Sequence, residues 1–312
     1  MPSRIGIGSR GDAMGWRPEH RSEAIWMRHV DITVGGGPVR VYLAGEAGPA
    51  LVLLHGAMLD TGLGVWHDVI ADLARDHRVY VVDLPRHGGS RPWRGTLDDR
   101  FYRRFMGALL DELGLDRVGL IGLSLGGGVA TGFALEHPDR VDALVAIGPG
   151  GLDAVRPYQF LTWVVTRTPG LLRATSWLLA RFPGLVRSSL AATLTAGVDT
   201  PGFDRIVGSA VEEALAKNRH GERALDDWQV QAYAPRTMRV YLTPELHRLA
   251  VPTLWIRGSG DPLVGADVLD EAHARTPDSQ LVAIAGAGHI VTYDQPAEVL
   301  RVLREFLRSR RE

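Results

Sequence analysis

Apolar and polar residues form short blocks along the chain, and these blocks predict strands and helices in turn. Residues 30–34 and 39–43 alternate around three successive glycines, a pattern typical of a β-hairpin. Continuous apolar runs are typical of strands buried on both faces, and they occupy 50–54, 78–82, 117–121, 141–147, 251–257 and 280–284. Helical spacing of apolar residues predicts helices over about 66–74, 97–113, 127–138 and 296–308.

Strands that alternate with helices predict a parallel sheet covered by helices on both faces, which is the α/β class. Between 151 and 245 no clear strand remains, and prolines interrupt apolar residues at helical spacing. We therefore predict a sheet domain over 26–150 and 246–312, a helical cap over 151–245 and a flexible extension over 1–25. The apolar residues of the cap are expected to pack its helices and, in part, to form the roof of an apolar pocket; they include Trp163, Leu171, Leu172, Trp177, Leu178 and Leu179.

Composition mainly excludes other classes of protein. With 312 residues, 45% of them hydrophobic and 23% charged, the chain is long enough for one large globular domain with an insertion. A formal net charge of −1 gives no electrostatic reason to expect nucleic acid or a membrane as a partner. The absence of cysteine excludes disulfides, thiolate metal sites and a cysteine nucleophile. The polar N-terminal segment does not have the pattern of a signal peptide, and no apolar run is long enough to span a bilayer, so we expect a cytoplasmic protein. We expect it to be a monomer or a homodimer.

The most informative local pattern is Gly122-Leu123-Ser124-Leu125-Gly126, between an expected strand and an expected helix. A serine on such a tight turn, with glycine two residues before and after it, is typical of a nucleophile elbow. A phosphate-binding loop or an ordinary turn is the alternative. Phosphate binding is disfavoured because the chain lacks the G-x-x-x-x-G-K-[ST] pattern and its single lysine, Lys217, is distant in sequence.

A serine nucleophile needs a base, and the base needs a carboxylate that orients it. His289 follows the expected strand 280–284, and Asp261 follows the expected strand 251–257. The order Ser124, Asp261, His289 is the one that accompanies this elbow in hydrolases. Asp153, which follows the strand 141–147, is the alternative acid; the glycines around Asp261 favour Asp261 because they allow its loop to turn back.

An oxyanion hole requires two backbone N–H groups beside the nucleophile. One is expected from Leu125, directly after Ser124, and the other from Ala57 in the loop after strand 50–54, with Met58 as the fallback. His55 is interpreted as a residue that orders this loop.

These motifs together resemble the α/β-hydrolase superfamily over residues 30–308. The segments that carry the resemblance are 53–56, 83–90, the elbow, 136–141, 258–261 and 286–289. The resemblance implies an eight-stranded, mostly parallel sheet, a helical cap, a Ser-His-Asp triad and no cofactor.

Residues 147–152 resemble the corresponding segment of meta-cleavage-product hydrolases, which cleave carbon–carbon bonds. Two positions differ from that group: Ile290 follows His289 where an aromatic residue is usual, and Leu123 rather than asparagine precedes Ser124. We therefore expect a hydrolase of a carboxylic ester or lactone with a small apolar substrate, and rank carbon–carbon hydrolysis second. Non-hydrolytic chemistry with the same triad, or a ligand-binding or signalling role for the pocket, is also compatible with these residues.

Overall fold

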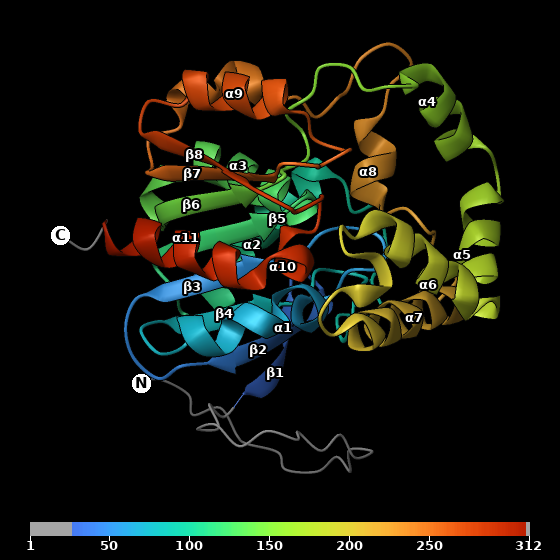
Figure 1. The fold of residues 1–312 in the computed structure, drawn as a ribbon, viewed down its shortest axis with the longest axis horizontal. Coiled ribbons are helices and arrows are strands. Elements are labelled where there is room, and N and C mark those ends of the chain that lie inside the picture. The colour runs from blue at the N-terminus through green and yellow to red at the C-terminus, as the bar shows by residue number, and fades with distance from the viewer. Residues whose placement is uncertain (1–26, 310–312) are drawn as a thin grey trace.

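An eight-stranded sheet forms the centre of the molecule (Figure 1). The computed structural model describes residues 27–309. β2 pairs antiparallel with β1 and β4, whereas the other neighbouring strands are parallel, in the order β1-β2-β4-β3-β5-β6-β7-β8. The α/β class and the mostly parallel eight-stranded sheet are therefore confirmed. The strands are β1 (Arg28–Val34), β2 (Gly37–Ala44), β3 (Ala50–Leu54), β4 (Arg78–Val82), β5 (Val118–Leu123), β6 (Val141–Ile147), β7 (Thr253–Gly258) and β8 (Ser279–Ile284).

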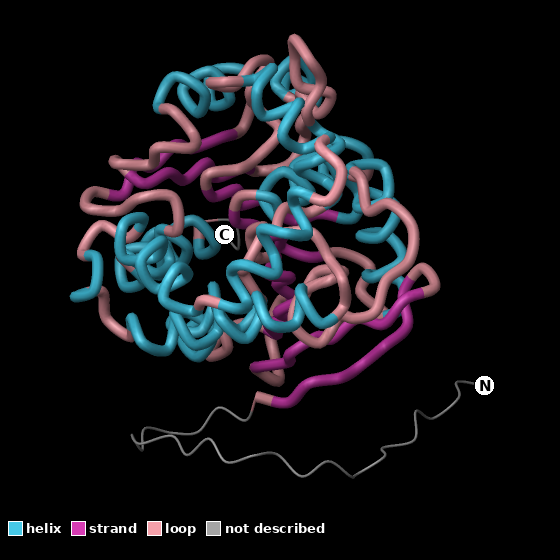
Figure 2. Tube along the Cα trace, turned by 90° about the vertical axis from the view of Figure 1, so that its right-hand side faces the viewer, coloured by secondary structure: helices cyan, strands magenta, loops and turns pink. Residues whose placement is uncertain are grey.

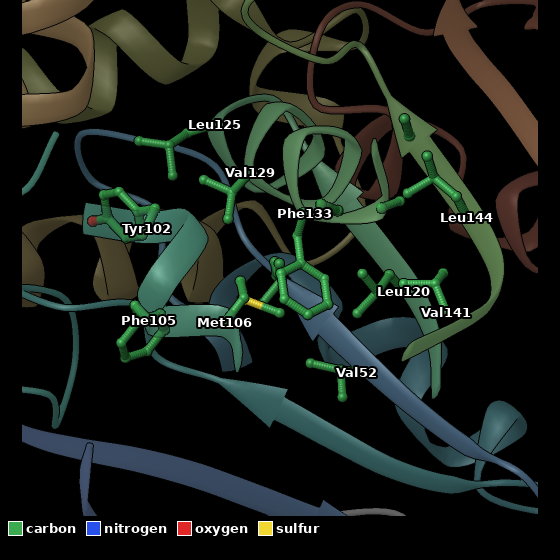
Figure 3. Close-up of a cluster of buried hydrophobic side chains, with 14 of the residues drawn as sticks. Val52, Tyr102, Phe105, Met106, Leu120, Leu125, Val129, Phe133, Val141 and Leu144 are labelled. Atoms are coloured by element: carbon green, nitrogen blue, oxygen red, sulfur yellow. The ribbon is translucent and has the colours of Figure 1, made fainter. Parts of the chain in front are cut away.

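Helices cover both faces of the sheet (Figure 1). Side chains of α1, α10 and α11 form a hydrophobic core with one face, and side chains of α2, α3 and α9 form a second core with the other. Figure 3 shows part of the second core, where Phe133 of α3 lies beside Met106 of α2 and Leu120 of β5. These helices are α1 (Gly62–Leu73), α2 (Asp99–Glu112), α3 (Leu125–Glu136), α9 (Ala266–Arg275), α10 (Val291–Asp294) and α11 (Pro296–Arg308), and a short 3₁₀ turn spans Pro138–Arg140.

The central strands owe their continuous apolar sequences to burial on both faces. Every residue of β3 and β5 is buried, and so is every residue of β6 except Asp142. β8, at the edge of the sheet, buries only Ile284. Each Å² of apolar surface that is buried contributes about 25 cal/mol to the free energy of folding, so these central strands are the main source of stability for the sheet.

Residues 151–245, which we call the cap segment, consist of helices and loops at one side of the sheet. They lie at the right of Figure 1 and face the viewer in Figure 2. The segment is described without any strand, and its β-structure consists of one isolated bridge between Tyr233 and Met238. The helices are α4 (Gln159–Arg167), α5 (Leu171–Arg181), α6 (Pro183–Thr193), α7 (Phe203–Arg219) and α8 (Asp227–Ala232), with 3₁₀ turns at Gly197–Asp199 and Thr243–Arg248.

The expectation for the apolar side chains of the cap segment was wrong for three of them. Leu171, Trp177 and Leu178 are exposed on the surface of the cap segment, so they do not form the buried packing or the pocket roof that we expected. α5 instead buries Leu172, Ser176 and Ala180, which lie on its other face at a spacing of four residues. The residues predicted to form the N-terminal extension, 1–25, lie outside the described part of the chain.

In the part of the chain from residue 27 to residue 309, we find no helix whose length and apolar character would allow it to cross a bilayer.

Candidate active site

Ser124 occupies the sharp turn between β5 and α3. Its backbone angles, φ 52° and ψ −113°, lie in a region that non-glycine residues rarely adopt. Three hydrogen bonds hold the turn: the Ser124 N–H donates to Ile147 O, and the Ser124 carbonyl accepts from the N–H groups of Gly128 and Gly150. Such imposed strain is common where a side chain must be held in one position for chemistry.

The glycines of the elbow are required by close backbone approach. A Cβ atom on Gly122 would lie 2.3 Å from the carbonyl oxygen of Gly126. A Cβ atom on Gly126 would lie 2.5 Å from the carbonyl oxygen of Leu54. Real Cβ atoms do not approach so closely, so the strand-to-helix turn can form in this shape only with glycine at both positions.

Leu125 is the first residue of α3, so its N–H has no acceptor within the helix. The partial positive charge of a helix N-terminus adds to the favourable environment for an anion there. A Cβ atom on Gly56 would lie 3.5 Å from the Cβ atom of Ser124, so the loop after β3 directly flanks the nucleophile. Both sources of oxyanion donors named from the sequence are therefore adjacent to Ser124.

His289 and Asp261 meet at the same edge of the sheet. The Nδ1 atom of His289 lies 2.9 Å from Asp261 Oδ2, and the imidazole is largely buried. Both side chains surround Gly148, directly after β6: a Cβ atom there would lie 3.1 Å from Asp261 Oδ2 and 3.2 Å from His289 Cε1. Since Gly148 follows the strand next to β5, the pair lies one strand away from the Ser124 turn.

Asp261 is held in its ionised form. Burial alone would raise the pKa of Asp261, but the hydrogen bond with His289 and the backbone N–H groups of Leu263 and Val264 lower the pKa below its usual value. The alternative acid, Asp153, lies 3.7 Å from Arg156 instead, and burial raises its pKa. Of the two candidate acids, Asp261 is the one within hydrogen-bond distance of His289, and its catalytic role stays a prediction.

Within residues 27–309, no hydrogen bond joins the Ser124 hydroxyl to His289. Catalytic hydrogen bonds in free enzymes are often long or misaligned and shorten when substrate binds. The transfer of a proton between these two side chains is therefore part of the proposal below.

The loop after β3 is fixed from two sides. His55 orders it as expected, because its Nδ1 contacts Gly56 O at 2.7 Å and its Nε2 accepts from Leu84 N–H at 2.9 Å. Met58 has a left-handed backbone, φ 64°, and its N–H donates to Asp226 Oδ2 at 2.7 Å. Because this N–H is already bonded, Met58 is not available as the fallback oxyanion donor, and Ala57 remains the assignment.

A buried group of charged side chains joins the cap segment to this loop. Lys217 of α7 contacts Asp226 at 2.6 Å, and His87 Nε2 lies 3.2 Å from the same carboxylate. His87 Nδ1 contacts the carbonyl oxygen of Asp60 at 2.8 Å. Asp226 and His87 thus hold the segment 57–60 through Met58 N–H and Asp60 O. Glu213, Arg91 and Glu222 extend the group.

Asp60 is a titratable residue beside the nucleophile that sequence reasoning missed. Its Oδ2 would lie 2.2 Å from a Cβ atom on Gly56, the same position that lies 3.5 Å from Ser124 Cβ. Burial raises the pKa of Asp60 to about 7, although nearby His289 and His87 oppose the increase. The signal was the interval His55-Gly56-x-x-x-Asp60, which places a carboxyl one turn beyond the expected oxyanion loop.

A polar cavity of about 340 Å³ lies where the loop after β4 meets the cap segment. Arg86, Lys217 and Asp226 are among its lining residues, whereas Ser124 and His289 are not. The apolar substrate pocket expected under the cap therefore remains a prediction. Among residues 27–309, no group of three or more His, Asp or Glu side chains is arranged to hold a metal ion.

Comparison with known proteins gives the family. Residues 49–296 match the family described as alpha/beta hydrolase fold. A protein of Mycobacterium tuberculosis described as uncharacterized is 31% identical over 279 residues, which cover 86% of this chain and 78% of that protein. The chain belongs to the α/β-hydrolase family, and it is a hydrolase.

Two further relatives have named activities. The 2-hydroxy-6-oxononadienedioate/2-hydroxy-6-oxononatrienedioate hydrolase of Burkholderia vietnamiensis is 29% identical over 296 residues, covering 92% of this chain and 97% of that protein. The crystal structure of carboxylesterase CesB from Bacillus subtilis has a TM-score of 0.69 at 23% identity, covering 91% of this chain and 92% of that one. The similarity to CesB shows the shared fold.

Proposed function

We propose that this hydrolase cleaves a carboxylic ester or lactone of a small apolar substrate through an acyl-enzyme on Ser124. The observation that carries the proposal is the hydrogen-bonded pair His289–Asp261 beside a strained serine elbow. A base held by an ionised carboxylate, next to a hydroxyl at a helix N-terminus, is the arrangement that activates serine for acyl transfer.

In the first half of the reaction, the Ser124 hydroxyl oxygen attacks the ester carbonyl carbon while Nε2 of His289 takes the hydroxyl proton. Asp261 keeps Nδ1 of the ring protonated and stabilises the imidazolium. The N–H groups of Leu125 and Ala57 stabilise the negative charge on the carbonyl oxygen, each by about 3 kcal/mol in the transition state. The bond to the alcohol oxygen then breaks, and His289 returns the proton to the leaving alcohol.

In the second half, water attacks the acyl-enzyme carbonyl carbon and loses a proton to His289. The bond between the acyl carbon and Ser124 Oγ breaks, His289 reprotonates Ser124, and the carboxylic acid leaves. We propose that the cap segment covers this edge of the sheet and limits the size of the acyl and alcohol groups.

Replacement of the nucleophile tests the proposal. We expect Ser124→Ala to abolish hydrolysis of p-nitrophenyl esters and labelling by a fluorophosphonate, with an unchanged thermal unfolding curve. Ser188→Ala, an exposed serine of α6, is the matched control and should retain both. Ester hydrolysis that persists in Ser124→Ala would refute the assignment.

Carbon–carbon hydrolysis of a ring-cleavage dienoate is the second candidate, because residues 147–152 resemble that group and the Burkholderia relative is named as a hydrolase of 2-hydroxy-6-oxononadienedioate. Decolorisation of such a dienoate, measured beside an ester and lactone panel of varied chain length, separates the two. Turnover of the dienoate far above that of every ester would favour this candidate. We rank it second because Ile290 and Leu123 stand where that group usually has an aromatic residue and an asparagine.

A further inference from the structure

The outer helices of the cap segment expose an unusual number of large apolar side chains. Of the fifteen exposed large hydrophobic residues in the described chain, eleven lie between 155 and 198. Scattered single residues of this kind are ordinary on a protein surface, whereas clusters indicate an interaction site. The eleven lie on α4, α5 and α6 or in the segments beside these helices, and we call this set the apolar cap face: Val155, Tyr158, Phe160, Leu161, Val164, Leu171, Trp177, Leu178, Phe182, Leu185 and Val198.

α5 shows how the apolar cap face is built. Leu171, Ala174, Trp177 and Leu178 recur at helical spacing on its exposed side, while its opposite side is buried. Trp177, 53% exposed, packs against Phe182 at the start of α6, with 6.5 Å between ring centroids. In Figure 1, α5 lies at the outer limit of the molecule, away from the sheet.

Within this stretch of sequence, the charged residues are all arginines. Residues 154–198 contain five arginines and no aspartate, glutamate or lysine, although the whole chain has a net charge of −1. Arg156 and Arg187 lie near carboxylates of Asp153 and Asp204. Within the described residues, Arg167, Arg173 and Arg181 have no carboxylate within 4.0 Å, although Arg173 lines a cavity that Glu222 and Asp227 also line.

Two of these arginines line a hollow that suits an anion. The hollow, about 260 Å³ in volume, lies at the turn between α4 and α5. Arg167, Arg173 and Arg223 are among its lining residues and no acidic residue is, although Arg223 also lies 3.7 Å from Asp227. Guanidinium groups form paired hydrogen bonds with phosphate oxygens. The hollow, with Gly170 and Leu172 in its lining, is next in sequence to exposed Leu171.

We infer that the apolar cap face docks on an anionic phospholipid surface. Tryptophan, phenylalanine and leucine enter the boundary between headgroups and acyl chains, while Arg167, Arg173 and Arg181 bind lipid phosphates. Helices that lie in a membrane interface combine such side chains with a basic polar face. The net charge of the chain, from which we expected no membrane partner, conceals this local separation of charge.

A second copy of the chain fits the same face less well. In a symmetric dimer the same patch meets itself, which would bring Arg167, Arg173 and Arg181 of both copies together. An anionic bilayer has negatively charged headgroups that attract the arginines, and an acyl-chain region in which the apolar side chains can be buried. The inference concerns binding alone and holds whether or not Ser124 reacts.

Vesicle cosedimentation tests the inference. The full chain with Ser124→Ala, which prevents consumption of any ester, is mixed with phosphatidylcholine vesicles or with vesicles that contain one part in four of phosphatidylglycerol. We expect binding to the anionic vesicles, weakening as salt increases, and little binding to phosphatidylcholine alone. Trp177→Ser with Phe182→Ser should weaken binding about tenfold, and Arg173→Gln with Arg181→Gln about twentyfold.

Matched controls lie away from the cap segment. Met27→Ser removes an exposed apolar side chain before β1, and Arg75→Gln with Arg301→Gln removes the same net charge as the test pair. Both should bind vesicles like the parent, and thermal unfolding curves should show that every variant is folded. The inference is overturned if anionic vesicles do not sediment the protein, or if test and control variants bind alike. A dimer in lipid-free solution that Trp177→Ser dissociates would overturn it in favour of self-association.

Discussion

Asp60 is the residue whose position has the clearest consequence for pH. Its carboxyl lies against Gly56, which also adjoins Ser124, and burial raises its pKa to about 7. A carboxyl whose pKa is higher in the folded protein contributes stability below its unfolded pKa, near 3.8, and that contribution is lost as the pH rises through 7. Above neutral pH the native chain therefore carries a buried carboxylate at Asp60, whose charge His289 and His87 offset only in part.

We expect Asp60→Asn to remove this cost. One pKa unit corresponds to about 1.4 kcal/mol, and partial solvent access to the carboxyl reduces the full effect. Relative to the native chain, the variant should therefore gain about 2 kcal/mol of unfolding free energy between about pH 5 and pH 8. Urea denaturation at several pH values measures the difference. A difference that does not change with pH would show that Asp60 titrates normally.

At the scale of elements, the turn from β5 into α3 depends on Gly126. A methyl group at this position would meet the carbonyl oxygens of Leu54 and His55, which belong to the backbone and cannot rotate away. Gly126→Ala should lower the unfolding free energy by about 2 kcal/mol. It should also reduce kcat for esters more than tenfold, because Leu125 N–H moves with the turn.

Gly107→Ala in α2 is the matched control for this substitution. A Cβ atom at Gly107 makes only ordinary contact, 3.8 Å from Phe133. Alanine favours helix over glycine by about 1 kcal/mol, so this variant should be slightly more stable and fully active. If the two variants behaved alike, close approach would not be the reason for glycine at 126.

Local sequence was a good guide to the elements of the sheet. β3, β4, β6 and α11 have the predicted bounds, because continuous apolar runs and a strongly amphipathic helix carry their burial pattern in adjacent residues. α1 begins at Gly62 rather than 66, since the Thr61 side chain caps it by accepting from Gly64 N–H and glycines obscure its first turn. α9 and α10 were not anticipated.

Long-range polar contacts were beyond sequence reasoning. The oxyanion-loop residue Met58 and its acceptor Asp226 are 168 positions apart, and neither sequence environment names the other. Ser124, Asp261 and His289 could be proposed because each follows a strand of one parallel sheet, whose carboxyl ends share an edge. The exposed side of α5 was misjudged because helical spacing reveals an apolar face without revealing what covers it.

At the scale of the whole molecule, Lys217 links the cap segment to the sheet domain. It is 1% exposed, and it neutralises Asp226, the acceptor for Met58 N–H. Burial would raise the pKa of Asp226, but Lys217 and His87 lower it. Removing one partner of a buried pair leaves an unpaired charge, which costs about 3–5 kcal/mol.

We therefore expect Lys217→Met to lower the unfolding free energy by about 3 kcal/mol and to reduce kcat, because the oxyanion loop loses its anchor. The double variant Lys217→Met with Asp226→Asn should recover part of the stability, since both charges are gone. Arg187→Met, which breaks the exposed pair with Asp204, should cost less than about 1 kcal/mol. Equal losses for Lys217→Met and Arg187→Met in urea denaturation would contradict this role.

The same lysine determines which reagents can modify the chain. With no cysteine in the sequence and its one ε-amine enclosed in an ion pair, the folded surface offers neither a thiol nor a lysine amine to a coupling reagent. Carbodiimide or arginine-directed reagents are the appropriate cross-linkers for detecting its complexes. A cysteine introduced at an exposed position such as Ala174→Cys would be a unique attachment point, so a single fluorophore could follow α5 without any background labelling.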